Sequence, residues 1–244
     1  MFNKKLLTAA LTTAVVSGAG LSQVASADDF EISGNIALTS DYRFRGISQS
    51  DEDAAVQGGF DAEFSPGFYL GVWGSSVDFD TNGEGFDGSL ELDYYGGWSS
   101  SIGDTDFGID VGYIYYDYPG DDGDEGDYQE FYVGGSWKDF SIQVNYSDDY
   151  YGETGDFFYY AAGASFALGE NFSLDLHVGY NDFEDTGFFA TDEDAYTDWS
   201  VTLGYSVFGV DLSVAYVDTD LDEEDVFGTD WADATAVFTN RKSM

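Results

Sequence analysis

Apolar and polar residues alternate with a period of two along most of this chain, and no other feature constrains its fold as strongly. Residues 140–147 read FSIQVNYS and residues 172–181 read FSLDLHVGYN, with every even position apolar. Successive side chains of a strand point to opposite faces, so each run predicts a strand with one apolar and one polar face. Twelve runs of about ten residues follow this pattern: 30–45, 54–64, 68–79, 89–99, 107–117, 128–138, 140–148, 157–168, 172–181, 196–206, 209–218 and 230–239.

The connections between these runs alternate strictly in length. Five are short turns, at 65–67, 101–104, 138–139, 169–171 and 207–209. The other six are longer and acidic, near 46–53, 80–88, 118–127, 149–156, 184–195 and 219–229. An even number of strands with short turns on one side and long loops on the other is typical of transmembrane barrels. The sequence therefore predicts an all-β fold, a transmembrane up-and-down antiparallel β-barrel of about 12 strands, with both chain ends on the short-turn side.

Aromatic residues decide between this barrel and a soluble β-sandwich or lipocalin-like barrel, which shows the same alternation. Aromatic pairs bracket the apolar face at both ends of four runs: Phe107 and Tyr115, Phe140 and Tyr146, Phe172 and Tyr180, and Phe208 and Tyr216. Eight residues of tilted strand cover roughly 20 Å of bilayer, close to the ~25 Å apolar band between the aromatic girdles of outer-membrane barrels. The repetition favours the membrane barrel.

The composition excludes several classes of protein. The chain has 48 Asp and Glu against 7 Lys and Arg, for a formal net charge of -41. Because a nucleic-acid binder needs a basic face, nucleic acid is not an expected partner. The absence of cysteine excludes a disulfide framework and cysteine-ligated metal sites. A hydrophobic content of 43% with 18% aromatic residues argues against the disorder that such acidity often indicates.

Residues 1–27 have the features of a secretory signal peptide. Lys4 and Lys5 precede a short apolar stretch without acids, and Ala25-Ser26-Ala27 forms an A-x-A cleavage site. A transmembrane anchor is the alternative, but the apolar stretch is too short for one. We therefore predict a signal peptide at 1–27, a single barrel domain at 28–244, and the outer membrane of a Gram-negative bacterium as the location. The basic residues left after cleavage are Arg43, Arg45, Lys138, Arg241 and Lys242.

If the apolar phase faces lipid, the opposite phase lines the lumen, because a cation facing mid-bilayer lipid costs about 2–4 kcal/mol. The first run then points Phe30, Ile32, Ile36, Leu38, Tyr42 and Phe44 outward, and Glu31, Asn35, Asp41, Arg43 and Arg45 inward. Later runs add the inward residues Gln57, Asp61, Glu63, Glu91, Asp93, Asp110, Glu130, Lys138, Gln143, Asn145, Asp175, His177, Asp198 and Asp211. The predicted lumen is polar and mostly acidic, with three cations.

Arg43 and Arg45 are one pleat apart, with Asp41 beside them. One interpretation is a constriction, where opposed charges filter solutes. The other is structural, with the arginines holding the strand register through carboxylates such as Asp61, Glu63 or Asp93. One network can do both.

Most of the acidic residues lie in or beside the six long connections. They can attract cations to a pore mouth, bind divalent cations through oxygen ligands, or form a solvated surface suited to salty water. The last interpretation is favoured. Asp121, Asp122, Asp124 and Glu125 are weak metal candidates, because they lack the ligand spacing of an EF-hand loop.

Catalysis finds little support in the sequence. The single histidine, His177, falls in the inward phase with Asp175 as its pleat neighbour, and a Ser–His–Asp set would need a serine nearby. No phosphate-binding loop, histidine metal cluster or nucleotide fingerprint is present. We expect neither enzymatic activity nor a cofactor.

Four segments carry a resemblance to a known family: NIALTSDYRFRGISQS at 35–50, AVQGGF at 55–60, GFYLGVW at 67–73 and ELDYY at 91–95. They resemble the opening of the TorF-type porin family of proteobacterial outer membranes. The likeness is specific over 35–98 and collinear to the end of the chain. It implies an outer-membrane barrel and singles out Asp41, Arg43, Arg45, Gln57 and Asp93.

The end of the chain departs from the usual pattern of such barrels, which finish on an aromatic residue. Here Phe238 lies six residues before the end. Either a short tail follows the last strand or the insertion signal is weak.

Together these features predict a porin-like channel for passive diffusion of small hydrophilic solutes or ions, leaning toward cations. Its expected partners are outer-membrane lipid, the solutes or cations, and the barrel-insertion machinery during assembly. The alternative is a closed structural or adhesive barrel whose acidic external loops bind divalent cations.

Overall fold

The computed structural model describes residues 30–79, 88–120, 126–184, 186 and 189–244. The predicted signal peptide and the candidates Asp121, Asp122, Asp124 and Glu125 lie outside these residues. No helix in the described part of the chain is long and apolar enough to cross a membrane.

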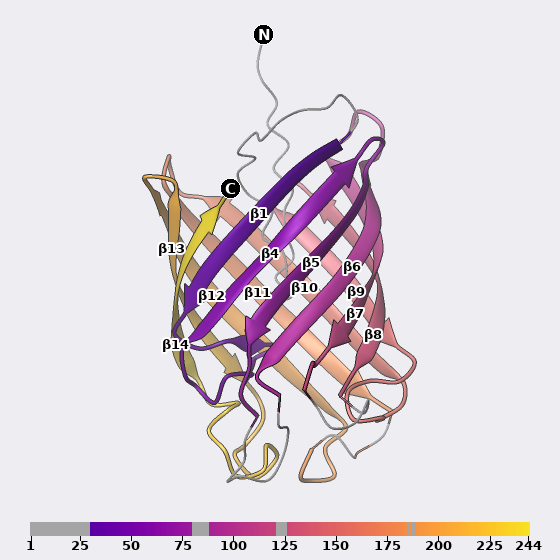
Figure 1. Ribbon diagram of the computed structural model, residues 1–244, viewed down its shortest axis with the longest axis vertical. Helices are drawn as coiled ribbons and strands as arrows, with labels where there is room; N and C mark the ends of the chain where they lie inside the picture. The colour runs from indigo at the N-terminus through magenta and orange to yellow at the C-terminus, as the bar shows by residue number, and fades with distance from the viewer. Residues whose placement is uncertain (1–29, 80–87, 121–125, 185, 187–188) are drawn as a thin grey trace.

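Twelve antiparallel strands close into the predicted up-and-down barrel, in the ring order β1-β14-β13-β12-β11-β10-β9-β8-β7-β6-β5-β4 (Figure 1). The wall consists of β1 (Phe30–Thr39), β4 (Ala55–Phe64), β5 (Phe68–Ser76), β6 (Leu90–Ser101), β7 (Phe107–Asp117), β8 (Tyr128–Trp137), β9 (Phe140–Ser147), β10 (Phe157–Ala167), β11 (Phe172–Phe183), β12 (Ala195–Val207), β13 (Val210–Thr219) and β14 (Thr235–Ser243). β1 pairs with β14 to close the ring, with Asn35 opposite Ser243.

Short turns and long connections alternate around the ring, as the sequence predicts. The shortest turns are two residues long, Lys138-Asp139 between β8 and β9 and Phe208-Gly209 between β12 and β13. Lys138, Phe208 and Gly209 have positive φ angles, which suits tight hairpin turns. Both ends of the barrel sheet, at Phe30 and Ser243, lie on the short-turn side.

The outer face of the barrel is apolar and bounded by aromatic residues at both ends. Near the short turns these residues form ring contacts between Phe30 and Phe64, Phe107 and Trp137, and Phe172 and Tyr205. Near the long connections they form contacts between Tyr113 and Phe131, Tyr146 and Phe158, and Trp199 and Tyr216. Exposed aliphatic side chains such as Ile142, Leu176 and Val178 lie between the two belts. An apolar band between two aromatic girdles is the arrangement of membrane-spanning barrels.

The first strand is shorter than predicted. It ends at Thr39, and residues 43–48 form a separate hairpin of β2 (Arg43–Phe44) and β3 (Ile47–Ser48). Arg45 and Gly46 form its two-residue turn with φ angles of 49° and 86°, the left-handed conformation that such turns require. Tyr42 and Phe44, predicted to face lipid, are instead buried, with 2% and 8% of their surface exposed. The alternating residues of this segment therefore belong to a second, smaller hairpin and not to the barrel wall.

The last strand begins and ends later than predicted. Residues 230–234 belong to the preceding connection, and β14 continues to Ser243. Phe238 therefore lies within β14, on the outer face, and the predicted tail is part of the strand.

Candidate functional site

The interior of the barrel differs between its two ends. We call the part next to the long connections the loop half. It is lined by inward aromatic side chains that are at most 5% exposed: Tyr116, Tyr128, Phe157, Tyr159, Phe183 and Tyr196. We call the part next to the short turns the turn half. It is lined mainly by small or polar residues, among them Ser33, Ser99, Gly134, Ser136, Ser173 and Gly204.

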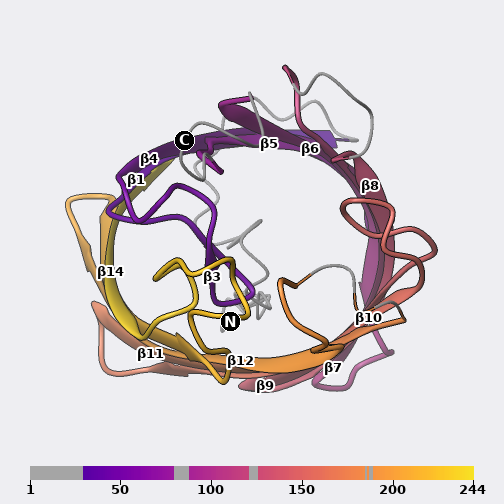
Figure 2. The same ribbon diagram turned by 90° about the horizontal axis from the view of Figure 1, so that it is seen from below.

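The first long connection, residues 40–54, enters the loop half, and we call it the crossing loop. It connects β1 to β4 and contains β2 and β3, and Figure 2 shows β3 inside the circle of strands. The Tyr196 hydroxyl on β12 donates a 3.0 Å hydrogen bond to the Arg45 carbonyl at its tip. Gly46 lies so close to Thr219 on β13 that a Cβ atom there would overlap that side chain. The Arg45 side chain extends to Glu130 on β8, across the ring from β1. The loop therefore spans the lumen.

Arg45 fixes the tip of the crossing loop to the wall through a buried ion pair. Its Nη2 donates to both carboxylate oxygens of Glu130, at 2.7 and 2.8 Å, and the two side chains are 1% and 0% exposed. Asn145 Nδ2 donates a further 2.7 Å bond to Glu130. The guanidinium lies 4.3 Å from the ring centre of Tyr159 and 4.8 Å from that of Phe157. Removing one partner of such a pair costs about 3–5 kcal/mol, because the other charge stays buried and unpaired.

Arg45 and Tyr42, both in the crossing loop, keep the protons that their contacts with carboxylates require. Burial acts to lower the pKa of Arg45, but the nearby Glu130 carboxylate, together with the surrounding tyrosines Tyr150, Tyr116 and Tyr128, more than offsets this, so the pKa lies above its ordinary value. Burial and the nearby Glu91 carboxylate raise the pKa of Tyr42. The Tyr42 hydroxyl therefore stays protonated, and it donates a 2.7 Å hydrogen bond to Glu91 Oε1 on β6. Arg45 and Tyr42 both hold the crossing loop against the wall.

Arg43 shapes the crossing loop itself. Its Nε donates to Asp41 at 2.5 Å and its Nη2 to Glu52 at 2.9 Å. Its Nη1 also donates to the carbonyls of Trp231 and Asp233 in the connection between β13 and β14. The two arginines thus differ in role: Arg43 joins two loops, whereas Arg45 joins a loop to the wall. Both lie in the crossing loop, not on the pleat of a wall strand as predicted.

The carboxylates expected to pair with the arginines, Asp61, Glu63 and Asp93, make no salt bridge to them in the described residues. Asp93, on β6, is fully buried, and neither carboxylate oxygen has a hydrogen-bond partner there. Its neighbours across the sheet are the aromatic Trp73 and Tyr116. Burying a charged carboxylate without a partner is costly, so a negative charge on Asp93 would destabilise the loop half.

The remaining predicted acids lie on the inner face toward the turn half. Asp61 on β4 accepts a hydrogen bond from the Tyr95 hydroxyl, and Asp110 on β7 accepts one of 2.7 Å from Tyr69. Asp175 on β11 accepts a 3.2 Å bond from Ser173 within its own strand.

Two further predicted residues lie on β4 away from the arginines. Glu63 is exposed near a short turn. Gln57 lies opposite Ser75, and its Nε2 donates a 3.4 Å bond to that hydroxyl. The structure therefore separates the predicted site residues into two groups, one in the loop half around the crossing loop and one toward the short turns.

Two basic residues differ from the prediction. Lys138 is exposed in the turn between β8 and β9, with its Nζ 4.8 Å from the Trp137 ring centre, and does not line the lumen. Arg241 on β14 points inward and interacts electrostatically with Asp211 and Asp61. The alternation of Val237, Thr239, Arg241 and Ser243 extends past the predicted end of the last run and could have revealed this cation.

His177 lies at mid-strand in β11, within a hydrogen-bonded network. Its Nε2 is 2.8 Å from the Tyr159 hydroxyl and 3.0 Å from Asp198 Oδ1. Asn181 Nδ2 donates a 3.0 Å bond to the other oxygen of Asp198. The pleat neighbour Asp175 is not part of this network, and no serine hydroxyl is bonded to His177 within the described ranges. The arrangement holds β10, β11 and β12 together and does not form a Ser–His–Asp set.

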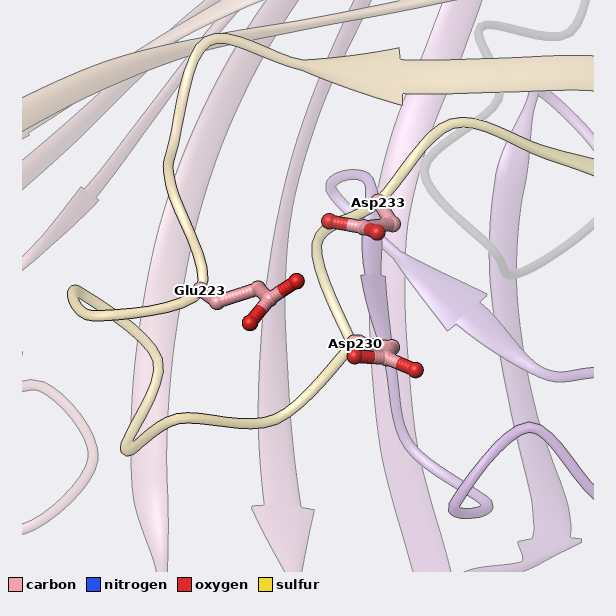
Figure 3. A group of neighbouring side chains, drawn as sticks. All are labelled: Glu223, Asp230 and Asp233. Carbon is pink, nitrogen blue, oxygen red and sulfur yellow. The ribbon is translucent and has the colours of Figure 1, made fainter.

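Glu223, Asp230 and Asp233 come together in the connection between β13 and β14 (Figure 3). One carboxylate oxygen from each lies within 4.8 Å of the others, and all three residues are exposed. Calcium takes 6–8 oxygen ligands, so three exposed carboxylates offer only part of a site.

Comparisons with known proteins agree with this architecture. Residues 23–244 match a family described as "Bacterial protein of unknown function (Gcw_chp)". No curated protein matches the chain in sequence. Among solved structures, a NanC porin is similar with a TM-score of 0.54 and 11% identity, over 86% of this chain and 97% of that one. A KdgM porin is similar with a TM-score of 0.55 and 9% identity, again over 86% and 97%.

A second KdgM structure, in complex with disordered oligogalacturonate, has a TM-score of 0.51 and 9% identity, over 87% of this chain and 95% of that one. At these identities the similarities establish the fold. The chain is a closed barrel of 12 antiparallel strands, like the barrels of these porins.

Proposed function

The chain belongs to the Gcw_chp family of bacterial proteins, and we propose that it is an outer-membrane channel for passive diffusion of small hydrophilic solutes, with a preference for cations. One observation carries the proposal: a closed barrel has an apolar, aromatic-belted outer face and a polar, mainly acidic inner face in its turn half. The predicted signal peptide and the resemblance to TorF-type porins support the same location.

The charges of the interior support a preference for cations. Arg43 and Arg45 are both engaged in salt bridges with carboxylates. In the turn half, Asp61, Asp110 and Asp175 face the lumen, and of these three Arg241 interacts with Asp61. A lumen lined by one sign of charge raises the local concentration of ions of the opposite sign. Oligogalacturonate, found with a KdgM porin, is a polyanion and does not suit such a lining.

The crossing loop acts as the constriction of this channel. It spans the loop half and is held by Arg45, Tyr42 and Tyr196, so solutes pass beside it. Its acidic members Asp41 and Glu52 face Arg43, which places charges of both signs at this level. Opposed charges at a narrow point filter solutes by charge as well as by size.

Planar-bilayer recordings of the refolded protein test the proposal. With a KCl gradient across the bilayer, we expect single-channel currents and a reversal potential whose sign shows cation preference. A reversal potential of the opposite sign would contradict the cation preference. The absence of any current, from protein shown to be folded by its heat-dependent mobility on gels, would contradict the channel.

The crossing loop also favours a second candidate, a closed structural or adhesive barrel whose acidic loops bind divalent cations. The aromatic packing of the loop half and the exposed Glu223, Asp230 and Asp233 support it. This candidate predicts folded protein without conductance and a rise in thermal stability on adding calcium. That rise should disappear in a variant with Asp230→Asn and Asp233→Asn.

A further inference from the structure

Two tyrosines of the turn half lie flat along the inner wall. In the register of the sheet, Tyr69 on β5 is opposite Gly97 on β6, Gly97 is opposite Gly112 on β7, and Gly112 is opposite Tyr132 on β8. The two tyrosines thus bracket two glycines in one row across four strands. Their hydroxyl groups hydrogen-bond to each other above those glycines.

The glycines are what allow the rings to lie flat. A Cβ atom built on Gly97 would lie 2.5 Å from the Tyr69 hydroxyl oxygen, and one on Gly112 would overlap the ring and hydroxyl of Tyr132. A glycine inside a strand often marks a place where another group approaches the backbone closely. Tyr69 and Tyr132 remain partly exposed, so each ring has one face on the wall and the other toward the lumen.

A third tyrosine extends this surface. Tyr95 on β6 is opposite Gly71 on β5, where a Cβ atom would overlap its ring, and its hydroxyl reaches Asp61 on β4. Together the rings of Tyr69, Tyr95 and Tyr132 cover the inner wall from β4 to β8. We call them the tyrosine wall.

Two hydroxyl groups of the tyrosine wall donate hydrogen bonds to carboxylates. Tyr69 donates to Asp110 Oδ1 at 2.7 Å, and Tyr95 donates to Asp61. A hydroxyl that donates to a carboxylate leaves its ring richer in electrons, and a cation is attracted to the face of such a ring. Arg241 interacts with Asp61, but no salt bridge joins Asp110 to a basic residue in the described ranges.

From this arrangement we propose that the tyrosine wall binds small organic ammonium cations and makes them preferred solutes of the channel. Ring faces favour a weakly hydrated organic cation over a strongly hydrated one such as sodium, because the cation must give up water to reach the ring. Asp110 supplies the negative charge beside the rings of Tyr69 and Tyr132, while Arg241 offsets the charge of Asp61 beside Tyr95. A neutral sugar could stack on the same rings, but it would gain nothing from the carboxylate charge.

The proposal rests on the proposed channel function for access to the wall, so its test uses two readouts. The first is the reversal potential with tetramethylammonium chloride on one side of the bilayer and sodium chloride on the other. We expect tetramethylammonium to be about two- to fivefold more permeant than sodium, the range that a partly exposed cation–π contact provides. The second is the unfolding temperature of the refolded protein in detergent, which a ligand that binds the folded state raises. It should be higher in tetramethylammonium chloride than in equimolar sodium chloride.

Variants assign these effects to the rings. Tyr69→Leu with Tyr132→Leu should abolish both effects, whereas Tyr69→Phe with Tyr132→Phe, which keeps the rings, should retain most of them. Tyr94→Leu, on the outer face of β6, is the matched control and should leave both unchanged.

The outcomes separate this inference from the channel function. Currents carried by sodium in preference, with no thermal shift, would overturn the tyrosine wall and leave the channel intact. A thermal shift without any current would overturn the channel and leave the binding surface intact. Sorbitol producing the same shift as tetramethylammonium, or an unchanged shift in the leucine variant, would also overturn the inference.

Discussion

The loop half and the turn half of the lumen use aromatic residues in opposite ways. In the loop half, Phe157 and Tyr159 are fully buried and pack around the guanidinium of Arg45, which arrives from the other side of the barrel. In the turn half, Tyr69 and Tyr132 instead lie along the wall over Gly97 and Gly112. The same strands carry both arrangements, since Glu130 and Tyr132 are pleat neighbours on β8.

The difference shows that strand alternation does not by itself determine whether a barrel is filled. What fills the loop half is a segment that leaves the sheet at Thr39 and returns at Ala55, bringing its own charges and rings. In the turn half, glycines beside Tyr69, Tyr95 and Tyr132 let the rings lie along the wall. We therefore expect substitutions in the loop half to affect stability, and those in the turn half to affect solute preference.

The largest expected effect on stability follows from Arg45→Ala. It leaves Glu130 buried without its cation, so we expect the free energy of unfolding to fall by about 3–5 kcal/mol. Urea unfolding in detergent, followed by heat-dependent gel mobility, measures this. Lys138→Ala, which removes an exposed cation from a turn, is the matched control and should change stability by less than about 0.5 kcal/mol.

The double variant Arg45→Met with Glu130→Leu checks the cause. Apolar residues of similar size often replace a buried ion pair without loss, so this variant should recover most of the stability lost in Arg45→Ala. Equal stability losses in Arg45→Ala and Lys138→Ala would show that the crossing loop is not held by this pair.

A smaller effect separates two glycines of the inner face. A Cβ atom at Gly179 would overlap the Tyr159 hydroxyl in the His177 network, so Gly179→Ala should lower the free energy of unfolding by about 1–3 kcal/mol. At Gly134 the nearest atom would be 3.5 Å away, an ordinary contact. Gly134→Ala should therefore be neutral within about 0.5 kcal/mol. Similar losses in both variants would contradict the close packing of Gly179 against Tyr159 as the cause.

The smallest effect concerns Asp93. The buried carboxylate oxygens of Asp93 have no hydrogen-bond partner in the described residues, so a negative charge on them is costly. Asp93→Asn removes that charge at nearly the same size and should raise the free energy of unfolding by about 1 kcal/mol. Glu130→Gln, an equally small change at a paired acid, should lower it. A loss of stability in Asp93→Asn comparable to that in Glu130→Gln would mean that Asp93 has a cationic partner.

The sequence predicts the strands of the barrel wall better than the loop that lies inside the lumen. The inward phase of Asp61, Asp110 and Glu130 follows from alternation alone, because a strand has only two faces. The same rule fails at Tyr42 and Phe44, since a hairpin inside the lumen alternates just as a strand facing lipid does. The Arg45-Gly46 turn between two short alternating pairs is the signal that distinguishes them.

Partners across the lumen lie beyond what alternation can predict. Arg45 is 85 residues from Glu130 in the chain, and only the closure of the ring and the path of the crossing loop bring them together. The tyrosine wall was missed for a different reason. Alternation does not distinguish Tyr69 and Tyr132 from other residues of the inner face, and the significance of Gly97 and Gly112 depends on the register of four strands.

Removing the crossing loop shows whether that loop sets the width of the channel. Thr39 pairs with Ala55 in the sheet, so residues 40–54 can be replaced by an Asn-Gly turn, with Glu130→Gln to avoid an unpaired charge. Glu130→Gln alone is the control that keeps the loop. We predict a markedly larger single-channel conductance in the loop-free variant than in either the control or the unmodified protein. An unchanged conductance, from a loop-free barrel that folds, would show that the crossing loop is not the constriction.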